Sequence, residues 1–117
     1  MIKANELRLG NWVLDVYDNK VKVTIIDDTV DWAKPIPLTP EILEKSGFVK
    51  QMEWTYCIEI QVGQKLVYYL GEKGWSIGNK NYSDFENLKY LHQLQNLYHA
   101  LTGEELEIKE FANFTTY

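Results

Sequence analysis

His92 and His99 are the first residues to consider as metal ligands or acid–base catalysts, because imidazole serves both roles. They lie seven residues apart in a segment with helical periodicity, which separates them by two turns, or about 10 Å, along the helix axis. Metal sites built on one helix use a closer spacing, such as the four residues of the zinc protease motif. The spacing therefore favours packing or surface histidines over a metal site or a catalytic pair.

The other reactive side chains also lack the partners that their chemistry needs. Cys57 is the only cysteine, so no disulfide forms within the chain, and no basic residue lies near it in sequence to favour a thiolate. Asp27, Asp28 and Asp31 lack the glycine and the distal glutamate of a calcium loop, and Gly71–Gly74 lacks the lysine-serine/threonine ending of a phosphate loop. We therefore predict no catalytic, metal-binding or cofactor-binding residues and expect a protein that is not an enzyme.

Composition limits the class of protein and its partners. The chain has 117 residues, 45% hydrophobic and 25% charged, which suits one globular domain over residues 1–117. Its formal net charge is −5, and Arg8 is the only arginine, which disfavours nucleic acid as a partner. The sequence has neither an apolar run long enough to span a membrane nor a signal peptide. We expect a cytoplasmic protein that does not bind a membrane.

Local signals predict a short helix over 40–46. Thr39 is a good N-cap, and Pro40 fits the first helical position. Leu38 and Leu43 occupy the two positions of a hydrophobic staple, and Gly47 is placed to end the helix in a left-handed cap.

Alternating apolar and polar residues predict strands on both sides of this helix, over 7–34 and over 53–77. We interpret the second region as an antiparallel meander and expect the first to curl into a small, partly open barrel. A tail over 104–117, with a short strand or turn at its start, ends the chain. The predicted fold class is α+β, a small antiparallel, partly barrel-like sheet with one short helix and one long C-terminal helix.

The long helix, predicted over 84–102, carries the most distinctive pattern. Its leucines and tyrosines gather in an arc roughly 120° wide that we expect to face the core. No Asp, Glu, Lys or Arg occurs between Tyr90 and Thr102, although a solvated helix face normally carries charges. Either another part of the domain or a second molecule covers the uncharged face. Its residues are the predicted interaction surface, for a protein partner or a homodimer: His92, Gln95, Asn96 and His99.

A weaker alternative is a nucleic-acid-binding face on the N-terminal strands. Aromatic side chains beside lysines can stack bases and neutralise phosphates. The residues of this alternative are Trp12, Lys20, Lys22 and Trp32.

Three stretches resemble a known family. They are Ala4–Val13, Pro35–Thr39 with Gly47 and Phe48, and His92–Leu106 apart from His99. Together they cover about a third of the chain and resemble a set of small uncharacterised proteins from Bacteroides-type gut bacteria and their phages or prophages. The resemblance implies a phage-related or mobile-element accessory protein in a bacterial cytoplasm. It carries no catalytic residues, so the expected function is protein–protein interaction.

Overall fold

The computed structural model describes residues 6–24, 32–52, 55–69, 74–77, 80–81 and 88–109. Two antiparallel sheets and two helices lie within these ranges, which confirms the α+β class. The elements in chain order are β1 (Trp12–Leu14), β2 (Lys20–Lys22), α1 (Pro40–Lys45), β3 (Val49–Met52), β4 (Thr55–Gln61), β5 (Gln64–Tyr69), β6 (Gly74–Ile77), β7 (Lys80–Asn81) and α2 (Leu91–Thr102).

The N-terminal strands form a hairpin. β1 pairs with β2, with Val13 opposite Val21, and Val21 is buried while Lys22 is exposed, as the alternation predicts. The buried carboxylate of Asp15 accepts hydrogen bonds from the backbone N–H groups of Tyr17 (2.8 Å) and Asn19 (2.9 Å), which fixes the turn. The structure shows β1 and β2 as a separate two-stranded sheet, and no sheet among the described strands closes into a barrel.

Helix α1 follows its local signals. The Thr39 side chain accepts a hydrogen bond from the Ile42 N–H, and Pro40 is the first helical residue. At the other end Gly47 has a φ of 93°, and the Phe48 N–H donates to the Leu43 carbonyl at 3.0 Å. This is a Schellman ending, so the short helix is defined at both ends by its own residues.

The second sheet is a five-stranded antiparallel meander in the order β3-β4-β5-β6-β7. On β4, Tyr56, Ile58 and Ile60 pack against the core, in keeping with the alternation of apolar and polar residues that predicts strands over 53–77. Trp54 lies outside the described residues. Cys57 is also buried, although it points to the opposite face of the strand.

Helix α2 begins at Leu91, not at residue 84 as the periodicity predicts. Residues 88–90 precede the helix as a non-helical segment held beside residues 36–38: the Leu38 N–H donates to the Lys89 carbonyl at 3.0 Å, and the Leu91 N–H donates to the Ile36 carbonyl at 2.8 Å. Tertiary pairing with the proline-rich segment therefore overrides helix propensity before Leu91. The predicted C-terminal end is confirmed, since the helix ends at Thr102.

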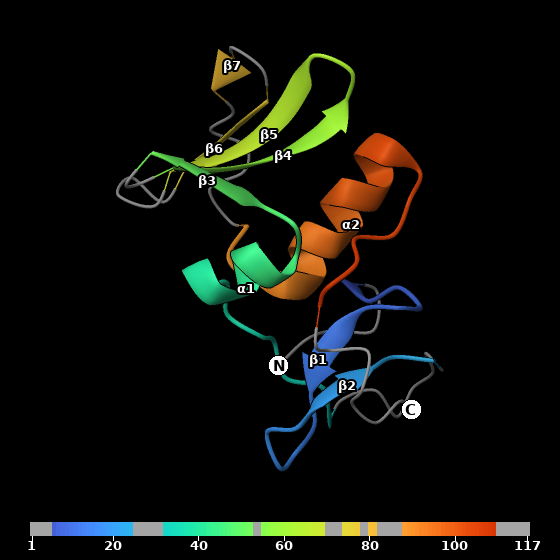
Figure 1. The fold of residues 1–117 in the computed structure, drawn as a ribbon. Helices are drawn as coiled ribbons and strands as arrows, with labels where there is room; N and C mark the ends of the chain where they lie inside the picture. Colours follow the sequence, from blue (N-terminus) through green and yellow to red (C-terminus); the bar gives the residue numbers. More distant parts are fainter. Residues whose placement is uncertain are drawn as a thin grey trace.

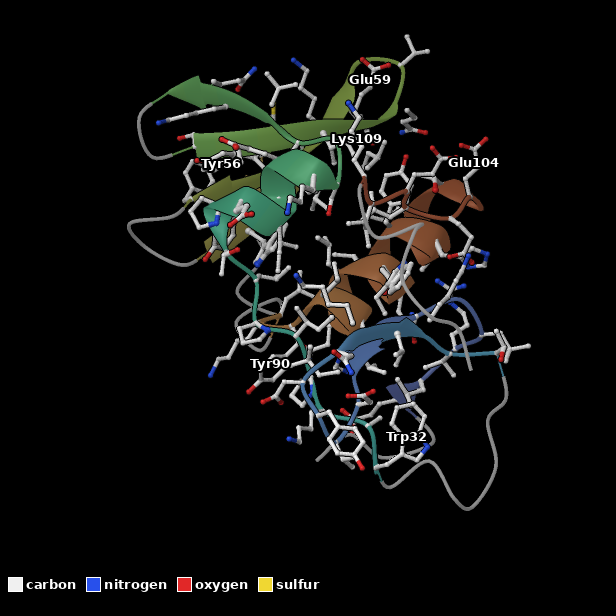
Figure 2. All side chains as sticks on the ribbon, turned by 60° about the horizontal axis from the view of Figure 1, so that its bottom comes forward. Trp32, Tyr56, Glu59, Tyr90, Glu104 and Lys109 are labelled. Carbon is white, nitrogen blue, oxygen red and sulfur yellow. The ribbon has the colours of Figure 1, made fainter. Side chains whose placement is uncertain are left out.

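Helix α2 lies between the five-stranded sheet and the hairpin (Figure 1). Trp32 beside the hairpin and Tyr56 in the meander lie at opposite ends of the molecule (Figure 2). In the described residues no helix is long and apolar enough to cross a membrane. Three hydrophobic clusters form the core. The main cluster, between the meander and the helices, contains Leu43, Phe48, Tyr56, Leu66, Trp75, Leu94 and Leu106. The second, where α2 meets the hairpin, contains Trp12, Ile36, Leu91 and Ile108, and the third, on the far face of the hairpin, contains Leu7, Val13, Val21, Val23 and Ala33.

We predict that Gly47→Ala lowers the free energy of unfolding by about 1 kcal/mol, because a Cβ disfavours the left-handed conformation. The added Cβ would lie 3.6 Å from Ile58 Cδ1, an ordinary contact, so packing adds little to this loss. Denaturant titration measures the effect. Gly47→Asn is the control, because asparagine tolerates this conformation, and an equal loss in both variants would contradict the explanation.

Candidate functional site

The uncharged side of α2 faces the N-terminal segment of the same chain. His92 is 2% exposed and Gln95 is 1% exposed, while Asn96 and His99 are half-buried. The predicted interaction surface is thus largely internal, which corrects its assignment as a docking face. Of the two explanations that the missing charges allow, coverage by another part of the domain describes this structure.

The side-chain amide of Gln95 both accepts a hydrogen bond from the backbone and donates one to it. Its Oε1 accepts a hydrogen bond from the Trp12 N–H at 2.7 Å, and its Nε2 donates to the Gly10 carbonyl at 3.1 Å. Because both backbone groups lie where the hairpin meets the helix, this one amide attaches β1 to α2.

Asn96 extends the attachment to the residues before β1. Its Nδ2 donates to the Glu6 carbonyl at 3.0 Å, and its Oδ1 accepts from Asn11 Nδ2 at 2.9 Å and from Arg8 Nε at 3.2 Å. The Arg8 guanidinium also forms an ion pair with both carboxylate oxygens of Glu105. The only arginine in the chain therefore joins the N-terminal segment, the helix and the segment that follows the helix.

His92 differs from Gln95 and Asn96 in the surroundings of its side chain. Both ring nitrogens are buried, and neither makes a hydrogen bond within the described residues. The ring stacks on Tyr90 with centroids 6.1 Å apart. Burial lowers the pKa of His92 below its ordinary value, and the carboxylate of Glu6 offsets part of that effect. His92 is thus a neutral packing residue at neutral pH.

The alternative aromatic and basic face does not form one surface. Trp12 and Lys22 are opposite each other on β1 and β2 and point to the same side. Trp32 instead packs against the core on the other face of the hairpin, and Trp12 is only 5% exposed. Lys20 is half-buried. A base-stacking platform that uses both tryptophans is therefore absent from these residues.

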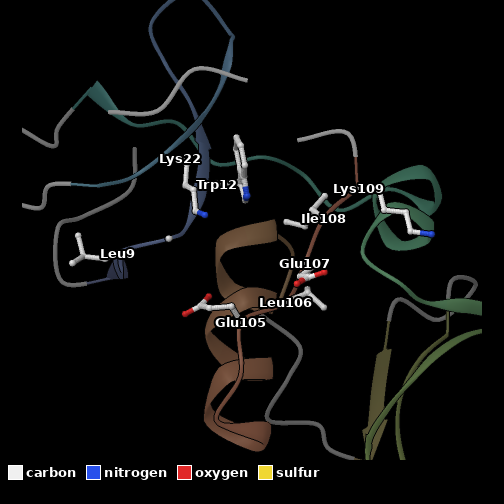
Figure 3. A pocket seen from close by; sticks show the side chains of 9 residues that line it. Leu9, Trp12, Lys22, Glu105, Leu106, Glu107, Ile108 and Lys109 are labelled. Carbon is white, nitrogen blue, oxygen red and sulfur yellow. The ribbon is translucent and has the colours of Figure 1, made fainter. Parts of the chain in front are cut away.

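A groove of about 700 Å³ lies where Trp12 and Lys22 face the segment after α2. Figure 3 shows both side chains pointing from the hairpin toward this segment. Leu106 and Ile108 are buried along it, while Glu105 and Glu107 are exposed, and Leu9, at the rim, is 57% exposed. The alternation of Glu105–Ile108 is visible in the sequence, where it indicates a short strand or turn, but its position beside Trp12 is not.

A second, shallower depression of about 270 Å³ lies on the outer face of the meander, with Cys57, Glu59 and Lys65 among its lining residues. Cys57 is 4% exposed there, as expected of a small packing residue. Asp27, Asp28 and Asp31 lie outside the described residues. Within the described ranges no three His, Cys, Asp or Glu side chains come together in a way that could hold a metal ion.

Comparisons of the chain with protein-family models, with curated proteins and with solved structures find no match.

We predict that Gln95→Met lowers the free energy of unfolding by about 2–5 kcal/mol, because it removes the acceptor for the Trp12 N–H and the donor to the Gly10 carbonyl. Denaturant titration measures the loss. Gln61→Met is the matched control, since its amide is exposed and bonds the exposed Gln64, and should change stability by less than about 0.5 kcal/mol. Similar losses of unfolding free energy in both variants would show that the two backbone hydrogen bonds of the Gln95 amide do not explain the effect.

We predict that stability falls as pH drops below about 6.5, because unfolded His92 then binds a proton that the folded chain excludes. The loss continues down to the lower pKa of the folded state, at up to about 1.4 kcal/mol per pH unit. His92→Leu should reduce the loss measured by denaturant titration between pH 7.5 and 5.5. His99→Gln should retain it, and an equal loss in the wild type and His92→Leu would exclude His92 as the cause.

Proposed function

We propose that the chain is a non-enzymatic protein-interaction module, a phage- or mobile-element-associated accessory protein of a bacterial cytoplasm, that holds its partner in the groove beside Trp12. The observation that carries the proposal is that this groove has a buried apolar floor and walls that are fixed within the chain. Trp12, Leu106 and Ile108 are each at most 6% exposed. A preformed groove binds with little loss of conformational entropy.

The walls of the groove are joined by interactions already present in the free chain. The ion pair between Arg8 and Glu105 connects the N-terminal segment to the segment after α2. The Lys109 N–H donates to the Lys45 carbonyl at 2.8 Å, which holds the same segment at its other end. These contacts support a docking site on the groove rather than on the face of α2, where partners are already supplied internally.

His92 is not placed to act as a general base. A general base needs a hydrogen-bonding route to the proton it takes. Both nitrogens of His92 are buried without partners in the described part of the chain.

Charge supports a protein partner over a nucleic acid. The net charge of the chain is −5, and the groove is lined by two glutamates, Glu105 and Glu107, and by two lysines, Lys22 and Lys109. A polyanion would meet as many acidic as basic groups there, whereas phosphate binding requires an excess of clustered cations. Nucleic acid is therefore the competing outcome of the experiment below.

We predict that the chain, used as bait in a nuclease-treated lysate of a Bacteroides-type bacterium, retains a discrete protein. Leu9→Lys should lose that protein, because it places a charge on the exposed apolar rim of the groove. Val49→Lys is matched in exposure and charge but lies on β3, outside the groove, and should keep it.

Capture that disappears on nuclease treatment would favour the nucleic-acid alternative. Capture that Leu9→Lys and Val49→Lys affect equally would exclude the groove as the docking site.

A further inference from the structure

We infer that the occupant of the groove is an extended peptide segment of a partner protein, which adds as a β-strand to Leu106–Ile108 and places a basic residue opposite Glu107. This inference rests on the proposed function and specifies the partner of the same groove.

The backbone of this segment is available for pairing. Leu106, Glu107 and Ile108 make no backbone hydrogen bond within the part of the chain that the structure describes. The side chains nevertheless alternate as in a strand, with Leu106 5% and Ile108 6% exposed on one side and Glu107 exposed on the other. The segment thus has the side-chain pattern of a strand without a strand partner.

The segment is held in place before any partner arrives. Glu105 at its start is fixed by Arg8, and the Lys109 N–H at its end is bonded to the Lys45 carbonyl. Its backbone donors and acceptors therefore need no further ordering to accept an added strand. Main-chain hydrogen bonds supply the affinity in this mode of recognition, and alternate side chains supply the specificity.

The side chains around the groove define the pattern of the peptide. Residues on the buried side would meet the apolar floor formed by Trp12 and Ile108. Glu107 makes no ion pair within the described residues, whereas Glu105 is already bound to Arg8. A basic residue opposite Glu107 would form a favourable cross-strand pair. The pattern is thus a lysine or arginine flanked on both sides by apolar residues.

The test uses the full chain and a capped heptapeptide of the pattern valine-threonine-valine-lysine-valine-threonine-valine. We expect measurable binding by calorimetry and slower amide hydrogen exchange at Leu106 and Ile108, because their N–H groups point to the edge opposite that of the bonded Lys109 N–H. Two versions of the peptide, N-methylated on alternate residues in the two possible phases, keep its charge and side chains. Since an added strand uses one edge, one phase should lose about tenfold in affinity and the other should lose little.

The charge pair is tested by reversal. Replacing the peptide lysine with glutamate should weaken binding by about threefold, and Glu107→Lys should reverse this preference. Glu104→Lys makes the same charge change at an exposed residue outside the groove and should leave the preference for lysine intact.

Equal affinities for the two N-methylated phases, or unchanged exchange at Leu106 and Ile108, would overturn strand addition. Protection of these amides that grows with protein concentration in the absence of peptide would instead identify a second copy as the occupant and overturn the inference. If the heptapeptide fails while Leu9→Lys still loses the captured protein, strand addition is wrong and the proposed function stands. If Leu9→Lys retains the captured protein, the proposed function itself fails.

Discussion

The hydrogen bonds from Gln95 and Asn96 to the N-terminal segment are the constraint on which the rest of the structure depends. They let α2 occupy the middle of the molecule, with the meander on one side and the hairpin on the other (Figure 1). The residues of the helix that meet the meander and the hairpin are buried, so charged residues at these positions would carry a desolvation cost; they are Leu91, His92, Leu94 and Gln95. Amide side chains avoid this cost because backbone groups satisfy them.

The groove follows from the same attachment. The interactions of Asn96 and Arg8 fix the N-terminal segment against α2, and Arg8 then reaches Glu105 beyond the end of the helix. Two segments far apart in sequence meet at this helix, since Pro37 pairs with Tyr90 just before it and Asn11, before β1, bonds Asn96 on it. Residues far apart in sequence thus have a shared structural role in positioning one central element.

Features set by neighbouring residues could be predicted from the sequence, and features set by distant ones could not. Helix α1 was predictable because Thr39 and Gly47 define its ends locally. The absence of charge on α2 indicated that the uncharged face is covered, but the covering partner of Gln95 is 83 residues away. The start of α2 at Leu91 depends on the pairing of Leu91 with Ile36. A local sequence pattern such as helical periodicity gives no information about a contact between residues so far apart. The groove was missed for the same reason.

The long sequence separation of these contacts has a consequence for synthesis on the ribosome. The hairpin emerges before α2, yet Gln95, whose amide helps to fix it, follows Trp12 by 83 residues. The meander, in contrast, pairs strands that are adjacent in sequence and closes short loops. The strands of the second sheet can therefore pair before the N-terminal hairpin has a fixed position, and the hairpin remains accessible to chaperones until α2 has emerged.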